Sequence, residues 1–176
     1  MNRRYFAAAG VAAVAGLAGW GAARWSGAGR PGSSGLSPET VAFWGSVLET
    51  PEGQALPLQR FSGQPLLVNF WATWCPPCVE ELPLLNRFYL EQRTKGWNVL
   101  GIAIDQPSAV RAWLAKKPLA FAVGMAGLQG TELSKSLGNQ SGGLPFSLVF
   151  AKSGAVLHQK SGQVQPAELA QWAAQI

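Results

Sequence analysis

Two stretches of the chain are apolar at almost every position. They are residues 65–71 (PLLVNFW) and residues 97–105 (WNVLGIAID). A strand that is covered on both faces has a nearly continuous apolar run, whereas a half-exposed strand alternates apolar and polar residues. The two stretches therefore predict neighbouring, parallel strands in the interior of a sheet.

A helical pattern follows each predicted strand. The first begins at Pro76 and Pro77, which suit the first turn of a helix, continues with an apolar stripe at helical spacing, and ends at Gly96. The second covers residues 107–117, which have one apolar face and basic residues in the last turn. The chain thus alternates strand and helix, which predicts an α/β fold.

The C-terminal part of the sequence contains further elements. A short helix is predicted at residues 131–137, strands at residues 146–150 and 155–158, and a closing helix at residues 166–174. The turn at residues 152–154 separates the two strands and predicts an antiparallel hairpin. Antiparallel strands added to the parallel pair make the predicted sheet a mixed one.

Residues 41–61 predict a leading β-hairpin. The apolar run VAFWGSVL (residues 41–48) is closed by a turn at residues 50–53, and ALPLQRF (residues 55–61) follows. Such apolar runs bounded by turn residues are typical of hairpin strands. We therefore expect an N-terminal β-hairpin extension that covers one edge of a central mixed β-sheet flanked by helices.

Length and composition restrict the class of protein. The 176 residues are 48% hydrophobic and 13% charged and include two cysteines. A chain this apolar is not disordered, and two cysteines cannot form a scaffold of several disulfides, so one globular domain is expected. The net charge of +5 is concentrated in residues 1–30, and residues 31–176 hold 10 Lys and Arg against 9 Asp and Glu. No nucleic-acid partner is therefore predicted.

The first 25 residues (1–25) have the composition of an export segment. Arg3 and Arg4 precede residues 5–23, which contain no charged residue, and Arg24 follows. The arginine pair and the aromatic residues after it partly resemble a twin-arginine signal. A cleaved signal peptide and a retained membrane anchor both remain open, because the apolar stretch is about long enough to span a bilayer.

The chain after this segment is expected outside the cytoplasm. Residues 26–38 are mostly Gly, Ser and Pro and predict a flexible linker, and residues 39–176 are predicted to form the folded domain. This domain lies on the periplasmic side of the inner membrane if residues 5–23 stay as an anchor, or free in the periplasm if they are removed. Disulfides persist there, which gives the two cysteines a candidate function.

Both cysteines lie in the sequence Trp74-Cys75-Pro76-Pro77-Cys78, where a predicted buried strand gives way to a predicted helix. Two intervening residues allow the cysteines to form either a disulfide or a dithiol, and the free N–H groups of the helix stabilise a thiolate. Cys75 is predicted to be the nucleophile, and the more buried Cys78 is predicted to release the product by attacking the mixed disulfide. Pro76 and Pro77 rigidify the turn.

This region resembles the thioredoxin superfamily, and within it the TlpA/ResA-like branch of membrane-tethered periplasmic thiol-disulfide oxidoreductases. The resemblance rests on residues 69–78 (NFWATWCPPC), 81–83 (ELP) and 143–145 (GLP), and it covers roughly residues 41–176. It implies a thioredoxin fold and an enzyme that exchanges disulfides through the two cysteines, without a cofactor.

The resemblance implies where a substrate binds. It implies that the Leu144–Pro145 peptide bond is cis and lies against the cysteine pair, where it offers an extended backbone edge to a substrate strand. Trp74 precedes the nucleophile and is expected at the surface as an apolar platform for a partner protein, whereas Trp71 is expected in the core. The predicted substrate-binding residues are Trp74, Pro76, Pro77, Leu144 and Pro145.

The resemblance also implies a proton acceptor for Cys78. Asn69 occupies the position where cytoplasmic thioredoxins carry a buried Asp. Glu81, about one helical turn after Cys78, matches the acid that takes its place in the TlpA/ResA-like branch. Burial beside the thiols raises the pKa of a carboxyl group toward the working pH. We therefore predict that Glu81 is a general base, in preference to a solvated acid such as Glu80.

Other functions fit the sequence less well. Zinc needs two ligands beyond the cysteines, but the chain has one histidine, His158, and no further cysteine. No metal is therefore predicted, although a copper-binding module remains an alternative. The favoured function is reduction of disulfides in selected periplasmic proteins, such as apocytochrome c or copper-site proteins, with electrons from a membrane thiol transporter. A disulfide-donating oxidase remains the main alternative.

Overall fold

The computed structural model describes residues 35–175. The predicted export segment and most of the predicted linker lie outside the described residues. The helices are α1 (Pro38–Trp44), α2 (Pro76–Gln92), α3 (Pro107–Lys116), α4 (Gly130–Ser136) and α5 (Pro166–Ala174). The strands are β1 (Val47–Glu49), β2 (Ala55–Pro57), β3 (Leu66–Trp71), β4 (Asn98–Ala103), β5 (Ala122–Met125), β6 (Phe146–Phe150) and β7 (Val156–Ser161). Within residues 35–175, no helix is both long and apolar enough to cross a membrane.

The seven strands of the described region form one mixed sheet in the order β2-β1-β5-β4-β3-β6-β7. β3 is central, because it pairs in parallel with β4 and antiparallel with β6. β7 extends the sheet beyond β6, and β1 pairs with β5 at the other side. As predicted, the two long apolar runs are adjacent parallel strands and a leading hairpin covers one edge.

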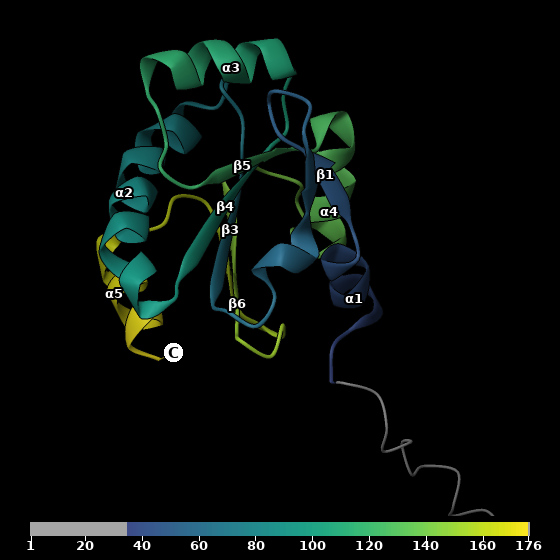
Figure 1. The fold of residues 1–176 in the computed structure, drawn as a ribbon, viewed down its shortest axis with the longest axis vertical. Helices are drawn as coiled ribbons and strands as arrows, with labels where there is room; N and C mark the ends of the chain where they lie inside the picture. The colour runs from purple at the N-terminus through teal and green to yellow at the C-terminus, as the bar shows by residue number, and fades with distance from the viewer. Residues whose placement is uncertain (1–34, 176) are drawn as a thin grey trace, which may run out of the picture. The chain divides into compact units, whose positions relative to one another are not determined.

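Helices cover both faces of the sheet (Figure 1). α2 and α5 pack over the face that presents Leu67 and Val99, and their buried side chains join one apolar cluster. α1 and α4 lie over the opposite face, which presents Leu66 and Phe70 to a second apolar cluster. Burying a side chain of this size contributes roughly 1.5–3 kcal/mol, so both clusters stabilise the fold.

The prediction of a strand at residues 41–48 is wrong for most of that range, because residues 38–44 form α1. The Ser37 Oγ accepts a hydrogen bond from the Thr40 N–H at 3.2 Å and caps the helix. Thr40 and Phe43 are buried, whereas Val41 is exposed, which is a helical spacing. A short apolar run does not distinguish a helix from a strand, and the hairpin is formed by β1 and β2 instead.

β5 was not predicted from the sequence. It has only four residues, and one of them is Gly124, a residue type that is depleted in strands. The position is closely packed, since a Cβ atom at Gly124 would lie 2.8 Å from the Leu48 Cδ1 atom of the hairpin and that side chain would have to shift. The predicted strand at residues 155–158 also extends further, because β7 ends at Ser161.

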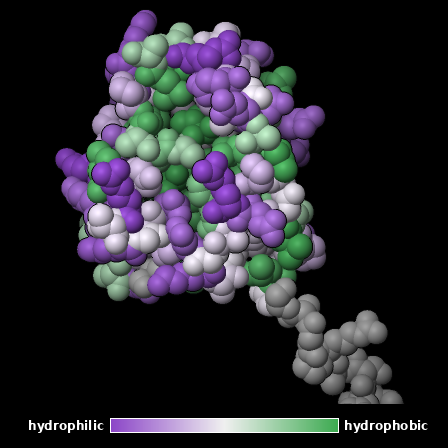
Figure 2. Space-filling view, viewed as in Figure 1, coloured by the Kyte–Doolittle hydropathy of each residue, from purple (hydrophilic) through white to green (hydrophobic). Residues whose placement is uncertain are grey.

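The surface of the domain is of mixed polarity. On the face shown in Figure 2, apolar residues gather below α3 and are bordered by hydrophilic ones. Exposed apolar side chains are usual in folded proteins. Within residues 35–175, the large apolar side chains that are exposed are Val41, Val47, Trp74, Leu90, Leu128 and Leu157. Trp74 differs from the others in this set because it directly precedes a cysteine.

Candidate active site

The two cysteines form a disulfide at the start of α2. The Sγ atoms of Cys75 and Cys78 are 2.03 Å apart. Cys75 is the N-cap residue of α2, and Cys78 lies in its first turn. Cys75 is 5% exposed and Cys78 is fully buried, so Cys75 lies closer to solvent. Because the free N–H groups of a helix N-terminus favour negative charge, this position suits a thiolate at Cys75 once the disulfide is reduced.

Asp105 fixes the segment that leads from β3 to the disulfide. Its Oδ2 atom accepts hydrogen bonds from the Thr73 N–H at 2.8 Å and from the Thr73 hydroxyl at 2.6 Å. Asp105 follows β4, so the contact joins the carboxyl ends of the two central parallel strands. Hydrogen bonds to a charged acceptor are stronger than neutral ones, and these two hold the chain just before Cys75 in place.

Glu81 lies inside the protein. Its side chain is 3% exposed, whereas its neighbour Glu80 is exposed. The Oε1 atom of Glu81 accepts a hydrogen bond from Asn69 Nδ2 at 2.7 Å, and its Oε2 atom accepts one from the Val164 N–H at 2.8 Å. Each carboxylate oxygen therefore has one fixed donor, which holds the group in a single orientation.

Burial raises the pKa of Glu81 from 4.5 to about 7, because loss of water disfavours the charged form. The hydrogen bonds from Val164 and Asn69 oppose this effect, since both stabilise the ionised carboxylate. The like charge of Glu168 adds a smaller increase. A carboxyl group that titrates near pH 7 can both accept and return a proton at neutral pH.

Asn69 links Glu81 to the neighbouring strand. Asn69 on β3 lies opposite Ser147 on β6 in the antiparallel register. The Asn69 Nδ2 atom donates to the Ser147 Oγ at 3.0 Å as well as to Glu81. Both residues are fully buried, so three polar side chains from β3, β6 and α2 form one buried cluster.

Pro145 lies at the same end of the sheet as the disulfide. The Leu144–Pro145 peptide bond is cis, and Pro145 is buried. Phe146, the first residue of β6, pairs with Phe70 near the end of β3, and the cysteines follow β3 along the chain. Leu144 packs against the apolar cluster that contains both cysteines. The segment before β6 therefore lies at the end of the sheet that the disulfide turn follows.

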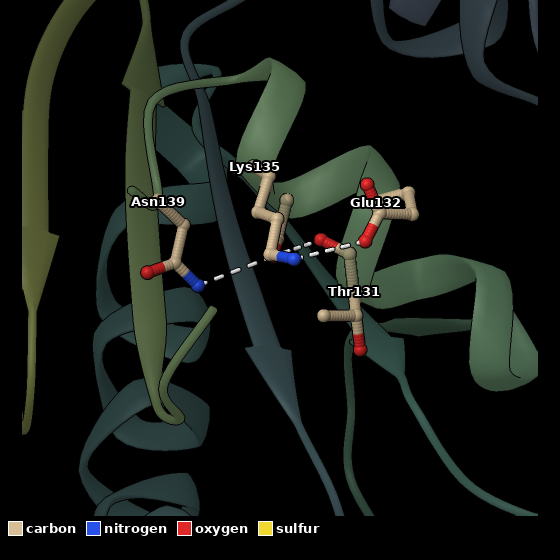
Figure 3. A network of polar contacts seen from close by, with 5 residues as sticks. Thr131, Glu132, Lys135 and Asn139 are labelled. Atoms are coloured by element: carbon tan, nitrogen blue, oxygen red, sulfur yellow. Dashed lines mark hydrogen bonds and ion pairs between the residues drawn. The ribbon is translucent and has the colours of Figure 1, made fainter. Parts of the chain in front are cut away.

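The loop that leads to Pro145 is organised by Asn139. The Asn139 Nδ2 atom donates to the Ser134 Oγ at 3.1 Å and to the Gly143 carbonyl at 2.9 Å. Figure 3 shows the Asn139 side chain turned toward α4, where Lys135 pairs with Glu132 at 3.0 Å. Asn139 is fully buried. Through its two hydrogen bonds it ties the backbone just before the Leu144–Pro145 bond to α4.

The remaining predicted side chains separate into surface and core. Trp74 is 65% exposed and Trp71 is fully buried, as expected for both indoles. Pro76 is exposed and Pro77 is half-buried. His158 stacks on the ring of Trp172 at 5.7 Å. Within residues 35–175, no three His, Cys, Asp or Glu side chains gather in a way that could hold a metal ion.

Several contacts of the site were not found from the sequence. They involve Asp105, Ser147 and the loop at residues 162–164, which lies between β7 and α5 and supplies the Val164 N–H. Each makes its contact with residues distant in the sequence, so no local spacing indicates it. A single polar residue within the buried strand FSLVF was the one available signal for Ser147.

Comparisons with known proteins place this geometry in a class. The chain is 30% identical over 127 residues to the thiol-disulfide oxidoreductase ResA of Bacillus thuringiensis subsp. konkukian. The matched region covers 72% of this chain and 71% of that protein. The protein is thus a thiol-disulfide oxidoreductase. Its two cysteines, Cys75 and Cys78, form a disulfide in the structure. The chain belongs to the Redoxin family, whose model matches residues 36–176.

Solved structures agree with this assignment. A thioredoxin-related protein from Neisseria meningitidis serogroup B superimposes with a TM-score of 0.65 at 27% identity, covering 74% of this chain and 97% of that chain. A putative thiol:disulfide interchange protein DsbE from Chlorobium tepidum gives a TM-score of 0.64 at 26% identity, covering 74% and 89%. The predicted thioredoxin-like fold, with its central mixed sheet flanked by helices, is confirmed.

Proposed function

We propose that this protein is an exported reductase of disulfides in selected periplasmic proteins. One observation carries the proposal: the Cys75–Cys78 disulfide is followed, one helical turn later, by the buried carboxyl group of Glu81. A dithiol cycle needs a group that takes up and returns a proton at neutral pH. The pKa of about 7 for Glu81 meets that need.

The first step is attack by Cys75. The Cys75 thiolate forms a bond to one sulfur of a substrate disulfide, the substrate S–S bond breaks, and its second sulfur leaves as a thiolate. Trp74 offers the exposed apolar contact for the substrate protein, and the backbone at Leu144 and Pro145 offers a strand edge. Pro76 and Pro77 shape the turn between the two sulfurs.

The second step is release by Cys78. Ionised Glu81 takes the proton of the Cys78 thiol, and the resulting thiolate attacks the Cys75 sulfur. The Cys75–Cys78 disulfide forms, the bond to the substrate breaks, and the substrate leaves as its second thiolate. Two electrons have then passed to the substrate, and a membrane thiol transporter restores the dithiol with two electrons.

The same residues support one direction of electron flow. A base that deprotonates Cys78 assists release of a reduced product, which favours reduction over disulfide donation. The TlpA/ResA-like resemblance supports substrates such as apocytochrome c or copper-site proteins. The uncharged stretch at residues 5–23, after two arginines, supports export and, if it is retained, attachment to the inner membrane.

The test is the reduction potential of the Cys75–Cys78 couple in the full chain, measured in glutathione and dithiothreitol buffers together with the pKa of the Cys75 thiol. We expect a potential below that of glutathione, as a dedicated reductase requires. A potential near that of strong periplasmic oxidants, with a very acidic Cys75 thiol, would instead identify a disulfide donor.

A further inference from the structure

The loop between β7 and α5 bonds to three different parts of the active site. We name residues 162–164 of this loop the strap. Its partners are the carbonyl oxygen of Pro145, the carbonyl oxygen of Pro77 and the carboxylate of Glu81. The first partner belongs to the proposed substrate edge, the second to the disulfide turn and the third to the proposed base.

Gln163 supplies the side-chain contacts of the strap. Its Nε2 atom donates to the Pro77 carbonyl at 2.9 Å and to Glu80 Oε2 at 3.1 Å. Pro77 lies between the two cysteines, so Gln163 is tied to the disulfide turn itself. The Gln163 side chain is half-buried, which allows its replacement without opening the core.

Both ends of the strap are fixed. The Gly162 N–H donates to the Pro145 carbonyl at 2.9 Å, and Gly162 has a φ of +82°, a conformation that favours glycine. At the other end, the Gln165 N–H donates to Glu168 Oε2 at 2.8 Å, where α5 begins. The Val164 side chain is 2% exposed and packs in the apolar cluster that contains the cysteines.

We propose that the strap is a positioning element, with Gln163 as its positioning residue, that holds the Glu81 carboxylate, the disulfide turn and the Pro145 edge at fixed separations during the reaction. This inference rests on the proposed function, because it assigns a task within the same site. The disulfide turn changes its bonding in each cycle. A misplacement of about 1 Å between reacting groups can cost about 10²-fold in rate, so a fixed reference is needed.

The groups around Glu81 determine how strongly the strap affects its ionisation. β3 presents the uncharged Asn69 to it, and Asn69 also donates to the uncharged Ser147 of β6. Two charged groups are tied to this region: Glu80 accepts a hydrogen bond from Gln163, and Glu168, which raises the pKa of Glu81, pairs with Lys160 at 2.8 Å. The Val164 N–H is thus one of two direct donors to the carboxylate, and loosening it removes support for the ionised form.

The first test is amide hydrogen exchange at Val164 in the full chain. Gln163→Ala removes the side-chain contacts, and Gln163→Met keeps about the size of the side chain without adding charge but has no N–H to donate. The control is Gln171→Ala, which changes an exposed glutamine of α5. We expect exchange at Val164 to become about tenfold faster in both Gln163 variants and to stay unchanged in the control.

The second test is the pH profile of disulfide exchange. We expect its midpoint to move to higher pH in both Gln163 variants, because ionised Glu81 loses support; a structural role alone would lower thermal stability without moving the profile. If both Gln163 variants show the wild-type exchange rate at Val164 and the wild-type pH profile, the positioning role of the strap is overturned. A wild-type chain without thiol-disulfide activity would overturn the proposed function instead. The exchange rate at Val164 would still show whether Gln163 holds the strap in place.

Discussion

The two faces of the central sheet are both covered by helices, but the strands beneath them differ in polarity. Toward α1 and α4, β3 and β6 present Leu66, Val68, Phe70, Phe146, Leu148 and Phe150, which are all apolar. Toward α2 and α5, the alternating positions of the same strands include Asn69 and Ser147, which lie opposite each other. Glu81 of α2 meets them there. On one face β3 and β6 contribute only apolar side chains, and on the other they contribute two members of a buried polar cluster.

The difference in polarity separates the face that mainly stabilises the fold from the face that contains the candidate active site. A buried polar group that lacks a hydrogen-bond partner destabilises a protein by about 1–3 kcal/mol. The Asn69, Ser147 and Glu81 side chains are accordingly held by hydrogen bonds to one another and to the Val164 N–H. A face selected for stability alone would have apolar side chains here. We propose that this polar cluster serves the proton transfer of the Cys78 thiol in the disulfide cycle.

Replacement of the cysteines has the largest expected effect. Cys75→Ser removes the nucleophile, so we expect reduction of a protein disulfide to be abolished. Cys78→Ser leaves the attack intact but blocks release, so mixed disulfides with partners are expected to accumulate and to be visible on non-reducing gels. Equal activity of Cys75→Ser and the wild type would refute the catalytic role of the pair.

Glu81→Gln removes the proton acceptor from the polar face with little change in size. We expect the rate of mixed-disulfide release above pH 7 to fall about 10²-fold, which is typical for loss of a general base. The wild-type rate should rise with pH through about 7 as Glu81 ionises, and this rise should be missing in the variant. The matched control is Glu91→Gln, at an exposed position further along α2, for which a wild-type profile is expected.

Leu148→Ala changes the apolar face. Leu148 is fully buried, so we expect the free energy of unfolding to fall by about 2–5 kcal/mol in urea denaturation. The pH profile of disulfide exchange should stay in place, because Leu148 lies on the side of the sheet away from Glu81. A shifted profile would mean that the two faces are not separate in function.

Ionisation of Glu81 also makes stability depend on pH. The pKa of Glu81 is raised in the folded state, so the folded protein binds this proton more tightly than the unfolded chain does. Stability is therefore greatest below pH 4.5 for this group and falls as pH rises to about 7, by about 3 kcal/mol in total. Urea denaturation at several pH values should show this fall in the wild type but not in Glu81→Gln. A similar fall in both proteins would assign it to other groups.

Trp74→Ala has the smallest expected effect on the fold. Because Trp74 is exposed, the free energy of unfolding should change by less than about 0.5 kcal/mol. The KM for protein substrates should rise several-fold, while reaction with small disulfides stays unchanged, since only a protein contacts the indole. Leu90→Ala on α2 is the control, and an equal rise in KM for that variant would exclude a specific platform at Trp74.

Much of the fold could be predicted because its elements have local signals. Residues 166–174 were predicted as the closing helix and form α5 with the same bounds. Residues 65–71 were predicted as a buried strand and correspond to β3. The errors occur where local signals are weak: the short apolar run of α1 is compatible with helix or strand, and the glycine in β5 hides a four-residue strand.

The candidate site divides in the same way. Cys75, Cys78 and Glu81 follow one another along a single helix, so their spacing is visible in the sequence. The contacts that orient them are not, because Val164 is 83 residues from Glu81 and Ser147 is 78 residues from Asn69. Only the folded sheet brings these groups together.

The most direct test of this account is a titration of the Glu81 carboxyl group, followed by carbon NMR in the disulfide form of the full chain. Glu81→Gln identifies the signal by its absence. The account predicts a midpoint at about pH 7, because the effect of burial on the pKa of the carboxyl group outweighs that of the hydrogen bonds from Val164 and Asn69. A midpoint near 4.5 would show that Glu81 is solvated and would contradict its role as the proton acceptor for Cys78.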